Sequence, residues 1–356
     1  MSVISPELRS AAVREAIASM RAYTLEPRVA ELKLDQNESP FDVPPEIKAA
    51  ILERAAQRPW NLYPDFELVR VREAWASAFG IAPDEVLFGN GSNELLLAAL
   101  ATFVEPGRRV VFPSPTFTLY EKLVVTLGGT PVPVPFDPAL GELPATAMIE
   151  AAAGSPETIF VVCSPNNPTG GVLAEGDLER LLDAGTVLLD RAYGEFDDAP
   201  MPPIDPRLVV FRTFSKAFGL AGLRIGAVVS TAANCREIRK VKLPYNLNFV
   251  SEEAAIAMLG QRELIEQRVA AIRAERERLI DAMRAIDGIR PFPTRANFVA
   301  FETSRAPRLV FDALLARGIL VRDVSAYPRL GSALRVSVGS AAQNDRFIQT
   351  LHEVMA

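Results

Sequence analysis

The sequence predicts an α/β fold with a mainly parallel sheet in a large domain, helices on both faces, and a smaller α+β domain. From Glu85 to Val229, short apolar runs alternate with helical patterns, which is typical of a parallel sheet covered on both sides. A long charged helical stretch, Ser251–Ala285, then precedes a second, shorter alternation of strands and helices. We therefore expect two hydrophobic cores within the 356 residues.

The strands of the large domain are expected at apolar runs bounded by turn-forming residues. These runs are Val86–Gly89, Arg109–Phe112, Pro131–Pro135, Thr158–Cys163, Val187–Leu189, Leu208–Arg212 and Ile225–Val229. Alternate prolines place Pro131–Pro135 at a sheet edge, because proline lacks the N–H that a central strand needs. The accompanying helices are expected at Pro44–Gln57, Phe66–Phe79, Asn93–Phe103, Phe117–Leu127 and Glu175–Ala184.

The two ends of the chain are expected to form smaller units. A helix at Pro6–Met20 and a strand at Leu32–Asp35 precede the polar turn Gln36–Pro40. The small domain is expected to contain Asn297–Glu302, Ala306–Arg317, Ile319–Val321, Leu334–Val338 and Asn344–Val354 in the order β-α-β-β-α. We expect residues 1–40 to form an arm that joins the small domain, 41–250 the large domain, 251–285 an interdomain helix interrupted near Gly260, and 286–356 the small domain.

Composition argues against several kinds of function. The net charge is −6 and no basic block is present, so we expect no nucleic-acid partner. Apolar runs are far shorter than the ~20 residues of a membrane span, and Met1–Arg9 does not resemble a signal peptide. Cys163, Cys235 and His352 lack metal-ligand spacing, and a single histidine argues against a histidine-based triad. We expect a reduced, cytoplasmic, metal-free protein whose chemistry depends on lysine, aspartate, tyrosine, arginine or a cofactor.

Lys216 follows the expected strand Leu208–Arg212, and strand C-termini are where open α/β sheets place ligand chemistry. A primary amine there can form a Schiff base with a carbonyl group. Ser215 and Arg224 add a hydroxyl and a guanidinium that suit a phosphate. An aldehyde that carries a phosphate describes pyridoxal 5′-phosphate, which we predict as the cofactor. The alternative is an ordinary surface lysine beside turn-forming glycines, and the rest of the site must decide between them.

Two further strand ends carry groups that suit a pyridine ring. Asp190 follows Val187–Leu189, and a carboxylate there can pair with a protonated ring nitrogen and make the ring an electron sink. Tyr193 and Asn167 can donate hydrogen bonds to the ring's phenolic oxygen. The alternatives are a helix-capping aspartate, a packing tyrosine and an ordinary Asn-Pro turn.

A phosphate cup is expected where Val86–Gly89 leads into an apolar helix. Gly91 lets backbone N–H groups converge, and Ser92 and Asn93 are residue types that begin helices, although a simple capped helix is the alternative. Phe117 and Tyr120 follow another strand, where an aromatic side chain can lie against a cofactor ring or belong to the core.

The order of these motifs resembles that of the fold-type I, class II pyridoxal-phosphate-dependent aminotransferases. The motifs are Gly91–Glu94, Pro115–Phe117, Asn167–Gly170, Asp190–Tyr193 and Ser215–Arg224. Further stretches are similar to the histidinol-phosphate aminotransferase branch, namely Leu34–Pro40, Tyr63–Asp65, Gly89–Ser92, Leu220–Arg224, Val321–Asp323 and Leu334–Gly339. The resemblance extends from about residue 20 to the end of the chain.

The resemblance implies a role for each motif residue. Lys216 forms the Schiff base and moves the proton, Asp190 pairs with the ring nitrogen, and Tyr193 and Asn167 contact the phenolic oxygen. Ser92, Asn93, Ser215 and Arg224 hold the phosphate, while Phe117, which is tyrosine in many relatives, stacks on the ring. Tyr63 reaches the cofactor phosphate of a neighbouring subunit, which implies a homodimer.

Three residues are implied to bind substrate. Arg335 and Arg322 match arginines that bind its anionic group, and Tyr23 matches a tyrosine that closes over it. A surface ion pair with Asp323 is the alternative for Arg322. The sequence after Tyr23, Arg28–Leu32, departs from the glycine-containing turn of relatives.

The implied reaction is the conversion of L-histidinol phosphate and 2-oxoglutarate to imidazole-acetol phosphate and L-glutamate in L-histidine biosynthesis. An aromatic or broad-specificity aminotransferase and a threonine-phosphate-type decarboxylase remain alternatives, because an arginine binds a carboxylate as well as a phosphate. A non-catalytic effector domain that binds the cofactor is a third alternative.

Overall fold

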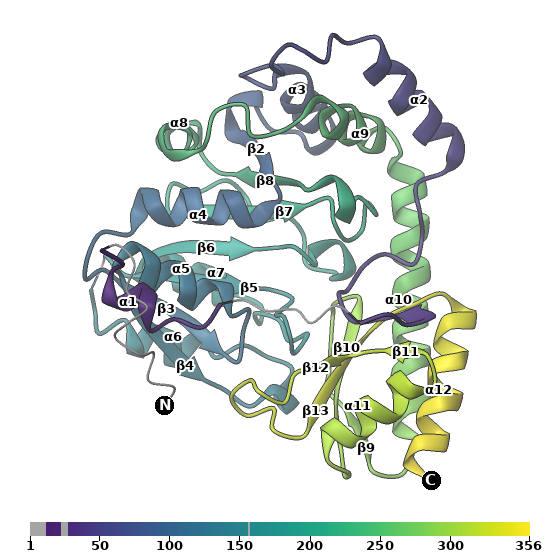
Figure 1. Cartoon of the computed structure of the whole chain (residues 1–356). Helices are drawn as coiled ribbons and strands as arrows, with labels where there is room; N and C mark the ends of the chain where they lie inside the picture. The colour runs from purple at the N-terminus through teal and green to yellow at the C-terminus, as the bar shows by residue number, and fades with distance from the viewer. Residues whose placement is uncertain (1–11, 23–27, 156) are drawn as a thin grey trace.

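A computed structural model describes residues 12–22, 28–155 and 157–356 of the chain, and its largest element is a seven-stranded sheet (Figure 1). Across the sheet the strands are β2 (Val86–Asn90), β8 (Ile225–Val229), β7 (Leu208–Thr213), β6 (Thr186–Asp190), β5 (Ile159–Cys163), β3 (Arg109–Ser114) and β4 (Thr130–Pro135). All neighbours from β7 to β4 are parallel. The predicted mainly parallel sheet is confirmed, and the proline-rich β4 lies at its edge.

Strand β8 is the exception, because it is antiparallel to both β2 and β7. The connection from β7 to β8 contains one short 3-10 turn, Ala221–Leu223, and is too short for the helical crossover that parallel strands require. The chain therefore turns back, and the start of β8 lies at the same sheet edge as the ends of its neighbours. This reversal brings Arg224 to the edge where Lys216 lies.

Helices pack against the large sheet as the alternating pattern predicts. They are α3 (Val69–Phe79), α4 (Ser92–Phe103), α5 (Leu119–Leu127), α6 (Ala145–Ala151), α7 (Asp177–Ala184) and α8 (Ala232–Val241). Helices α2 (Pro45–Ala56) and α9 (Phe249–Leu259) pack against each other, and α9 also packs against α3. Helix α3 begins three residues later than expected, because the Asp65 carboxylate accepts hydrogen bonds from the backbone N–H groups of Glu67 and Val69. Helices α6 and α8 were not predicted, since one is short and the other is largely polar.

A second sheet has four antiparallel strands, in the order β12 (Arg322–Asp323), β13 (Ala333–Ser337), β10 (Phe298–Thr303) and β9 (Ile289–Pro291). Helices α11 (Pro307–Ala316) and α12 (Ala341–Met355) accompany it. The expected strand at Ile319–Val321 does not join this sheet. Instead β11 (Ile319–Leu320) pairs in parallel with β1 (Leu32–Lys33) from the N-terminal part of the chain.

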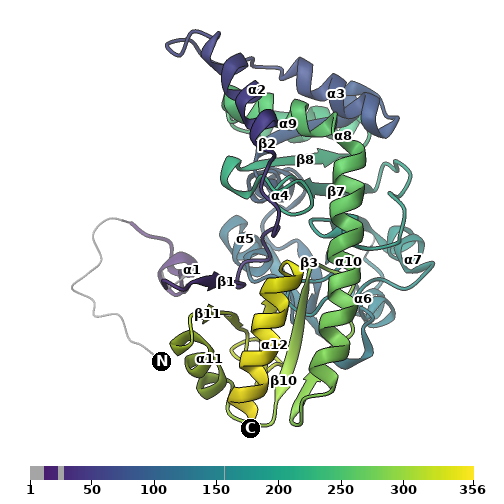
Figure 2. The same ribbon diagram turned by 90° about the vertical axis from the view of Figure 1, so that its right-hand side faces the viewer.

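Helix α10 (Arg262–Arg284) runs alongside the molecule from the large sheet to the second sheet (Figure 2). The predicted interruption separates it from α9 at Gly260–Gln261. Arg276 on α10 donates hydrogen bonds to the Phe196 and Ala296 carbonyl oxygens, one from each side. Of the expected helix at Pro6–Met20, the described part contains α1 (Glu15–Ala18). The expected domain boundaries stay predictions. No helix among the described residues combines the length and apolarity needed to cross a membrane.

Candidate active site

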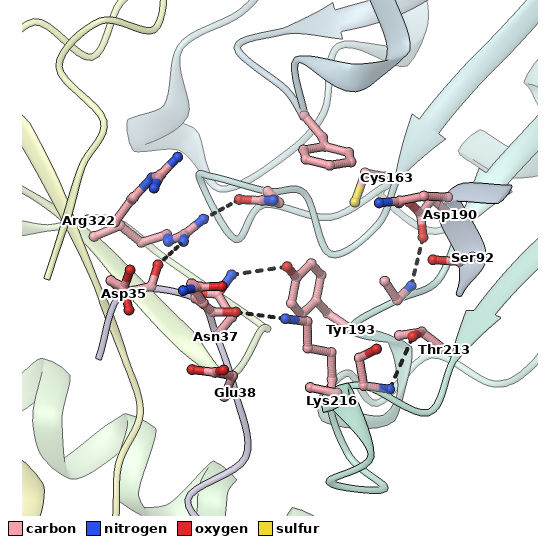
Figure 3. A pocket seen from close by; sticks show the side chains of 18 of the residues that line it. Asp35, Asn37, Glu38, Ser92, Cys163, Asp190, Tyr193, Thr213, Lys216 and Arg322 are labelled. Carbon is pink, nitrogen blue, oxygen red and sulfur yellow. Dashed lines mark hydrogen bonds between the residues drawn. The ribbon is translucent and has the colours of Figure 1, made fainter. Parts of the chain in front are cut away.

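A cavity of about 480 Å³ lies at the edge of the large sheet where β2, β3, β5, β6 and β7 end. Figure 3 shows Asp190, Tyr193 and Lys216 on the large-sheet side and Arg322 on the opposite side. The predicted site residues that line it are Ser92, Asn93, Phe117, Asn167, Asp190, Tyr193, Ser215, Lys216, Arg224, Arg322 and Arg335. Tyr63 lies elsewhere and is 80% exposed, and Tyr23 lies outside the described residues.

The cup expected at Gly91 is formed by close approach of three segments. Strand β2 enters α4 through Gly91, which has φ +80° and no side chain that caps the helix. A Cβ on Gly91 would lie 2.5 Å from Nη2 of Arg224, and one on Gly226 would lie 2.3 Å from the Ser92 nitrogen. The Arg224 guanidinium also donates to Ser215 Oγ at 3.3 Å. A helix N-terminus, a hydroxyl and a guanidinium therefore converge on one point, which suits a phosphate.

The Asp190 carboxylate is buried at the end of β6 and is held from two sides. Tyr120 donates to Oδ2 at 2.7 Å. The Ala192 backbone N–H donates to Oδ1 at 2.9 Å, and this bond is the dashed line at Asp190 in Figure 3. Burial raises the pKa of Asp190, and the Tyr120 hydrogen bond opposes that shift. A buried carboxylate of this kind favours a cationic partner in the cavity. The ring of Phe117, perpendicular to Tyr120 with centroids 5.6 Å apart, lines the cavity too.

Lys216 follows β7 and directs its amine into the cavity, where Nζ donates to the Gln36 carbonyl oxygen at 2.8 Å (Figure 3). Burial lowers the pKa of Lys216 to about 7, and the positive charge of Arg335 adds to the effect. Near neutral pH a large share of this amine is uncharged, which is the form that attacks a carbonyl or removes a proton.

The Lys216 amine is expected to titrate in the cofactor-free protein near pH 7 rather than near pH ~10.5. Labelling by trinitrobenzenesulfonate, followed by peptide mass spectrometry, should rise through pH 7 at Lys216. The unfolded chain keeps this proton up to about pH 10.5, whereas the folded chain loses it near pH 7. The free energy of unfolding should therefore rise with pH between pH 7 and about 10.5. Labelling of Lys216 that rises only near pH ~10.5 would contradict this.

The N-terminal segment closes the cavity above Tyr193. Asn37, which is buried with φ +54°, donates from Nδ2 to the Tyr193 hydroxyl at 3.0 Å. Its backbone is held from the second sheet, because Asn37 N–H donates to Ser337 Oγ and Asn297 Nδ2 donates to the Asn37 carbonyl. One asparagine thus ties the second sheet to a residue at the end of β6.

Arg335 and Arg322 are direct cross-strand partners on β13 and β12, so their side chains share one face of the sheet. Arg335 is buried and donates to Asn167 Oδ1 and to the Asp35 carbonyl oxygen. The bond to Oδ1 leaves the Asn167 NH2 group as the end that can donate to a ligand. Asp323 accepts from the N–H and hydroxyl of Ser325, and Arg322 lines the cavity instead of pairing with its neighbour.

Two like charges facing each other across a strand pair are destabilising unless an anion lies between them. The geometry of Arg322 and Arg335 therefore suits a doubly charged or bidentate anion, such as a phosphate or a carboxylate. Both arginines line the same cavity as Lys216, so the anion would belong to the molecule on which the amine acts.

Sequence reasoning missed several lining residues. Asp35, Gln36 and Asn37 enter through the polar turn that follows the short strand, and this turn was the available signal. Tyr120 was considered as a stacking residue, whereas its hydroxyl bonds Asp190. Cys163 ends β5 beside Asp190, and nothing in its local sequence indicated that it lines a cavity.

Comparison with known proteins places this site in a family. The model for "Aminotransferase class I and II" matches residues 30–351. A histidinol-phosphate aminotransferase of Chlorobium luteolum is 38% identical over 347 residues, which cover 96% of this chain and 97% of that protein. One of Prosthecochloris aestuarii is 37% identical over 352 residues, with 97% and 98% covered. The crystal structure of histidinol-phosphate aminotransferase from Sinorhizobium meliloti in complex with pyridoxal-5′-phosphate has a TM-score of 0.85 at 26% identity, covering 98% and 99% of the two chains.

The chain therefore belongs to the class I and II aminotransferases, enzymes of the fold-type I class that use pyridoxal 5′-phosphate. Within that family the relatives just described are histidinol-phosphate aminotransferases, matched over nearly their whole length. The residues present fit the cofactor: the glycine-lined cup suits its phosphate, the buried Asp190 suits its ring nitrogen, and the Lys216 amine suits its aldehyde.

Proposed function

We propose that this chain transfers the amino group of L-histidinol phosphate to 2-oxoglutarate, forming imidazole-acetol phosphate and L-glutamate in L-histidine biosynthesis. The pair formed by Arg322 and Arg335 is the observation that carries this proposal, because it offers two guanidinium groups in the cavity that holds Lys216. A phosphate on the amino donor and a carboxylate on the acceptor would each satisfy them in turn.

We propose the following roles for the lining residues. Ser92, Asn93, Ser215 and Arg224 hold the cofactor phosphate, Phe117 stacks on the ring, and Asp190 holds the ring nitrogen in its protonated form. Tyr193 and the NH2 group of Asn167 donate to the ring oxygen, while Asn37 orients Tyr193. The cofactor supplies an electron sink for the electron pair left when a proton is removed from the substrate's α-carbon.

Lys216 performs the proton transfer in this proposal. Its amine would remove the substrate's α-proton and hold it at Nζ for later release, and a pKa near 7 lets this group accept and release a proton at neutral pH. The Gln36 carbonyl oxygen accepts from Nζ and holds the amine within the cavity. Arg335 binds the substrate anion and holds Asn167 through Oδ1, so one residue orients both substrate and ring donor.

The proposed reaction is tested by following glutamate formation from 2-oxoglutarate with three amino donors: L-histidinol phosphate, L-histidinol and L-phenylalanine. L-histidinol phosphate should have the highest kcat/KM. L-histidinol should have a much lower kcat/KM, because it leaves the arginine pair without an anion. Faster reaction of L-phenylalanine would make the enzyme an aromatic aminotransferase. Release of CO₂ from threonine phosphate without a keto acid would make it a decarboxylase.

Arg322→Gln should raise the KM for L-histidinol phosphate by about 10–150-fold, since a hydrogen bond to a charged group contributes ~1.5–3 kcal/mol. The KM for L-histidinol should change little, because that donor lacks the phosphate. Arg308→Gln, on the exposed face of α11, is the matched control and should leave both values unchanged. Equal effects on the two donors would assign Arg322 a structural role instead.

We also propose a homodimer, supported by an exposed apolar patch. The patch consists of Trp60, Leu62, Tyr63, Phe66, Leu243 and Tyr245, with exposed fractions of 44–80%. Tyr63 and Tyr245 stack with centroids 4.5 Å apart, and Phe66 contacts Tyr245. Next to the patch, Asn246 donates to Glu94 on α4, the helix that begins at the phosphate cup. A second copy on this patch would place its Tyr63 near that cup.

Leu243→Glu should convert the dimer to a monomer and lower the affinity for the cofactor, because a charge would enter the apolar patch. Sedimentation velocity and cofactor titration measure the two effects. Leu309→Glu is the control, since Leu309 is similarly exposed at 61% on α11, away from the patch. A monomeric Leu243→Glu protein with full cofactor affinity would contradict the role of Tyr63.

The cytoplasm is our proposed compartment. Both cysteines of the chain, Cys163 and Cys235, are buried free thiols, whereas paired cysteines are typical of oxidising compartments. Cell fractionation would test this.

A further inference from the structure

Asn166 is a fully buried residue that does not line the active-site cavity, although its neighbour Asn167 does. It follows β5, a strand whose residues are all apolar and buried. A side-chain amide in such surroundings is costly unless its polar atoms are hydrogen-bonded. The Oδ1 atom of Asn166 accepts from the Thr116 hydroxyl at 2.6 Å. Its Nδ2 atom donates to the Pro115 carbonyl oxygen and to Thr169 Oγ1, both at 2.9 Å.

These bonds join two loops whose strands are not paired near the cavity. The loops follow β3 and β5, which are neighbouring parallel strands, and the register between these strands ends at Val111 and Phe160. The register of β5 with β6, in contrast, continues to Cys163 and Asp190 at the cavity. Strand pairing therefore fixes the end of β5 against β6 but not against β3. The Asn166 side chain supplies a bridge on that side.

The two loops carry two groups that would contact the cofactor ring. Phe117 directly follows Thr116, Asn167 directly follows Asn166, and both line the cavity. In their proposed roles, Phe117 lies on the face of the ring and Asn167 donates to the oxygen at its edge. A planar ring can meet both groups only if the spacing between the two loops is fixed. The bond from Thr116 to Asn166 fixes this spacing.

The loop after β5 is also held from the second sheet. Arg335 of β13 donates to Asn167 Oδ1, and the Arg295 backbone N–H, just before β10, donates to the Gly170 carbonyl oxygen at 2.9 Å. A substrate anion on Arg335 would therefore act on this loop too. Asn166 ties the same loop to the large sheet, which carries the rest of the cofactor site.

We propose that Asn166 is a positioning residue of the cofactor site, which acts through Thr116 to hold Phe117 and Asn167 at a fixed spacing around the ring. This inference rests on the proposed roles of Phe117 and Asn167. The alternative is a buried amide that contributes to the stability of the fold alone. The two differ in what happens to the bound cofactor when the bridge is removed.

Thr116→Val removes the bridging hydroxyl, keeps the shape of the side chain, and changes no residue that lines the cavity. Donors to the ring oxygen favour its ionised form, so a displaced Asn167 should let the bound cofactor keep its proton to higher pH. Spectrophotometric titration of the cofactor-loaded protein should give a midpoint about half a pH unit higher or more, and equilibrium dialysis an affinity for pyridoxal 5′-phosphate about threefold weaker or more. Thr116→Ser keeps the hydroxyl and should restore both values.

Thr158→Val is the matched control. Thr158 is also buried, its hydroxyl donates to the Ala152 carbonyl oxygen at 3.5 Å, and it does not line the cavity. Both valine variants lose a buried hydroxyl, and urea unfolding of the cofactor-free proteins measures what this costs in stability. Thr158→Val should leave the titration midpoint and the cofactor affinity unchanged. Equal changes in the two variants would overturn the proposal, because they would follow from lost stability alone.

Two alanine variants separate this inference from the proposed function. Asn167→Ala removes the ring donor itself and should raise the midpoint at least as far as Asn166→Ala. A raised midpoint in Asn167→Ala, with a native midpoint in Asn166→Ala and Thr116→Val, would overturn the positioning role and keep the proposed role of Asn167. A native midpoint in Asn167→Ala would overturn that role and this inference with it. If Asn166→Ala does not fold, the milder Thr116→Val decides, and neither titration depends on the identity of the amino donor.

Discussion

Lys216→Ala is expected to lower the rate of transamination by about 10²–10⁴-fold. The substitution removes the amine that enters the cavity with a pKa near 7, and positioned acid–base groups contribute roughly 10²–10⁴-fold to such rates. Steady-state formation of glutamate from L-histidinol phosphate and 2-oxoglutarate measures the loss. Added methylamine should restore part of the activity, because a small amine can enter the space left by the side chain.

Two variants separate chemistry from folding in this experiment. Lys216→Arg keeps a positive charge but cannot supply a neutral amine at neutral pH, so it should lose as much activity as alanine. Lys240→Ala removes an exposed lysine that pairs with Glu237 on α8 and should be fully active. A fully active Lys216→Ala enzyme would refute the proposed mechanism.

Asp190→Asn is expected to lower kcat by about 10²–10⁴-fold while the protein remains folded. Loss of one partner of a buried ion pair costs ~3–5 kcal/mol, and each 1.36 kcal/mol is tenfold in rate. Asparagine has nearly the same shape and can still accept from the Ala192 N–H, so the change removes mainly the negative charge. Rapid-reaction measurement of the half-reaction with L-histidinol phosphate reports the effect directly.

Tyr120→Phe provides the comparison for Asp190. It keeps the carboxylate and removes one donor that holds it, so the rate should fall by roughly 10–150-fold, less than for Asp190→Asn. A larger loss of rate in Tyr120→Phe than in Asp190→Asn would mean that the Tyr120 hydroxyl contributes more to the rate than the Asp190 charge.

The chemistry-bearing residues of the large sheet were predictable because each stands next to a strong local signal. Buried strands such as β5 and β7 are continuous apolar runs, and in a parallel sheet their C-terminal ends meet at one edge. Asp190 and Lys216 each follow such a run, so their convergence followed from the strand pattern alone. The apolar helical pattern after Gly91 likewise predicted where α4 begins, and with it the position of the phosphate cup.

Other contacts depend on pairing between distant segments, which leaves no local pattern. The hydrogen bond from Asn37 to Tyr193 joins residues 156 positions apart, and the bond from Arg335 to Asn167 joins residues 168 positions apart. The pairing of β1 with β11 is of the same kind, since two-residue strands are too short to show a period.

The sequence by itself determined the fold class, the cofactor and the residues around Lys216, because apolar periodicity and turn residues act over a few neighbours. Tertiary structure decided the antiparallel course of β8 and the position of Tyr120 beneath Asp190. It also decided the register that sets Arg322 beside Arg335. Each of these depends on packing between segments that are far apart in the chain. The free energy of that packing cannot be read from any local stretch of residues.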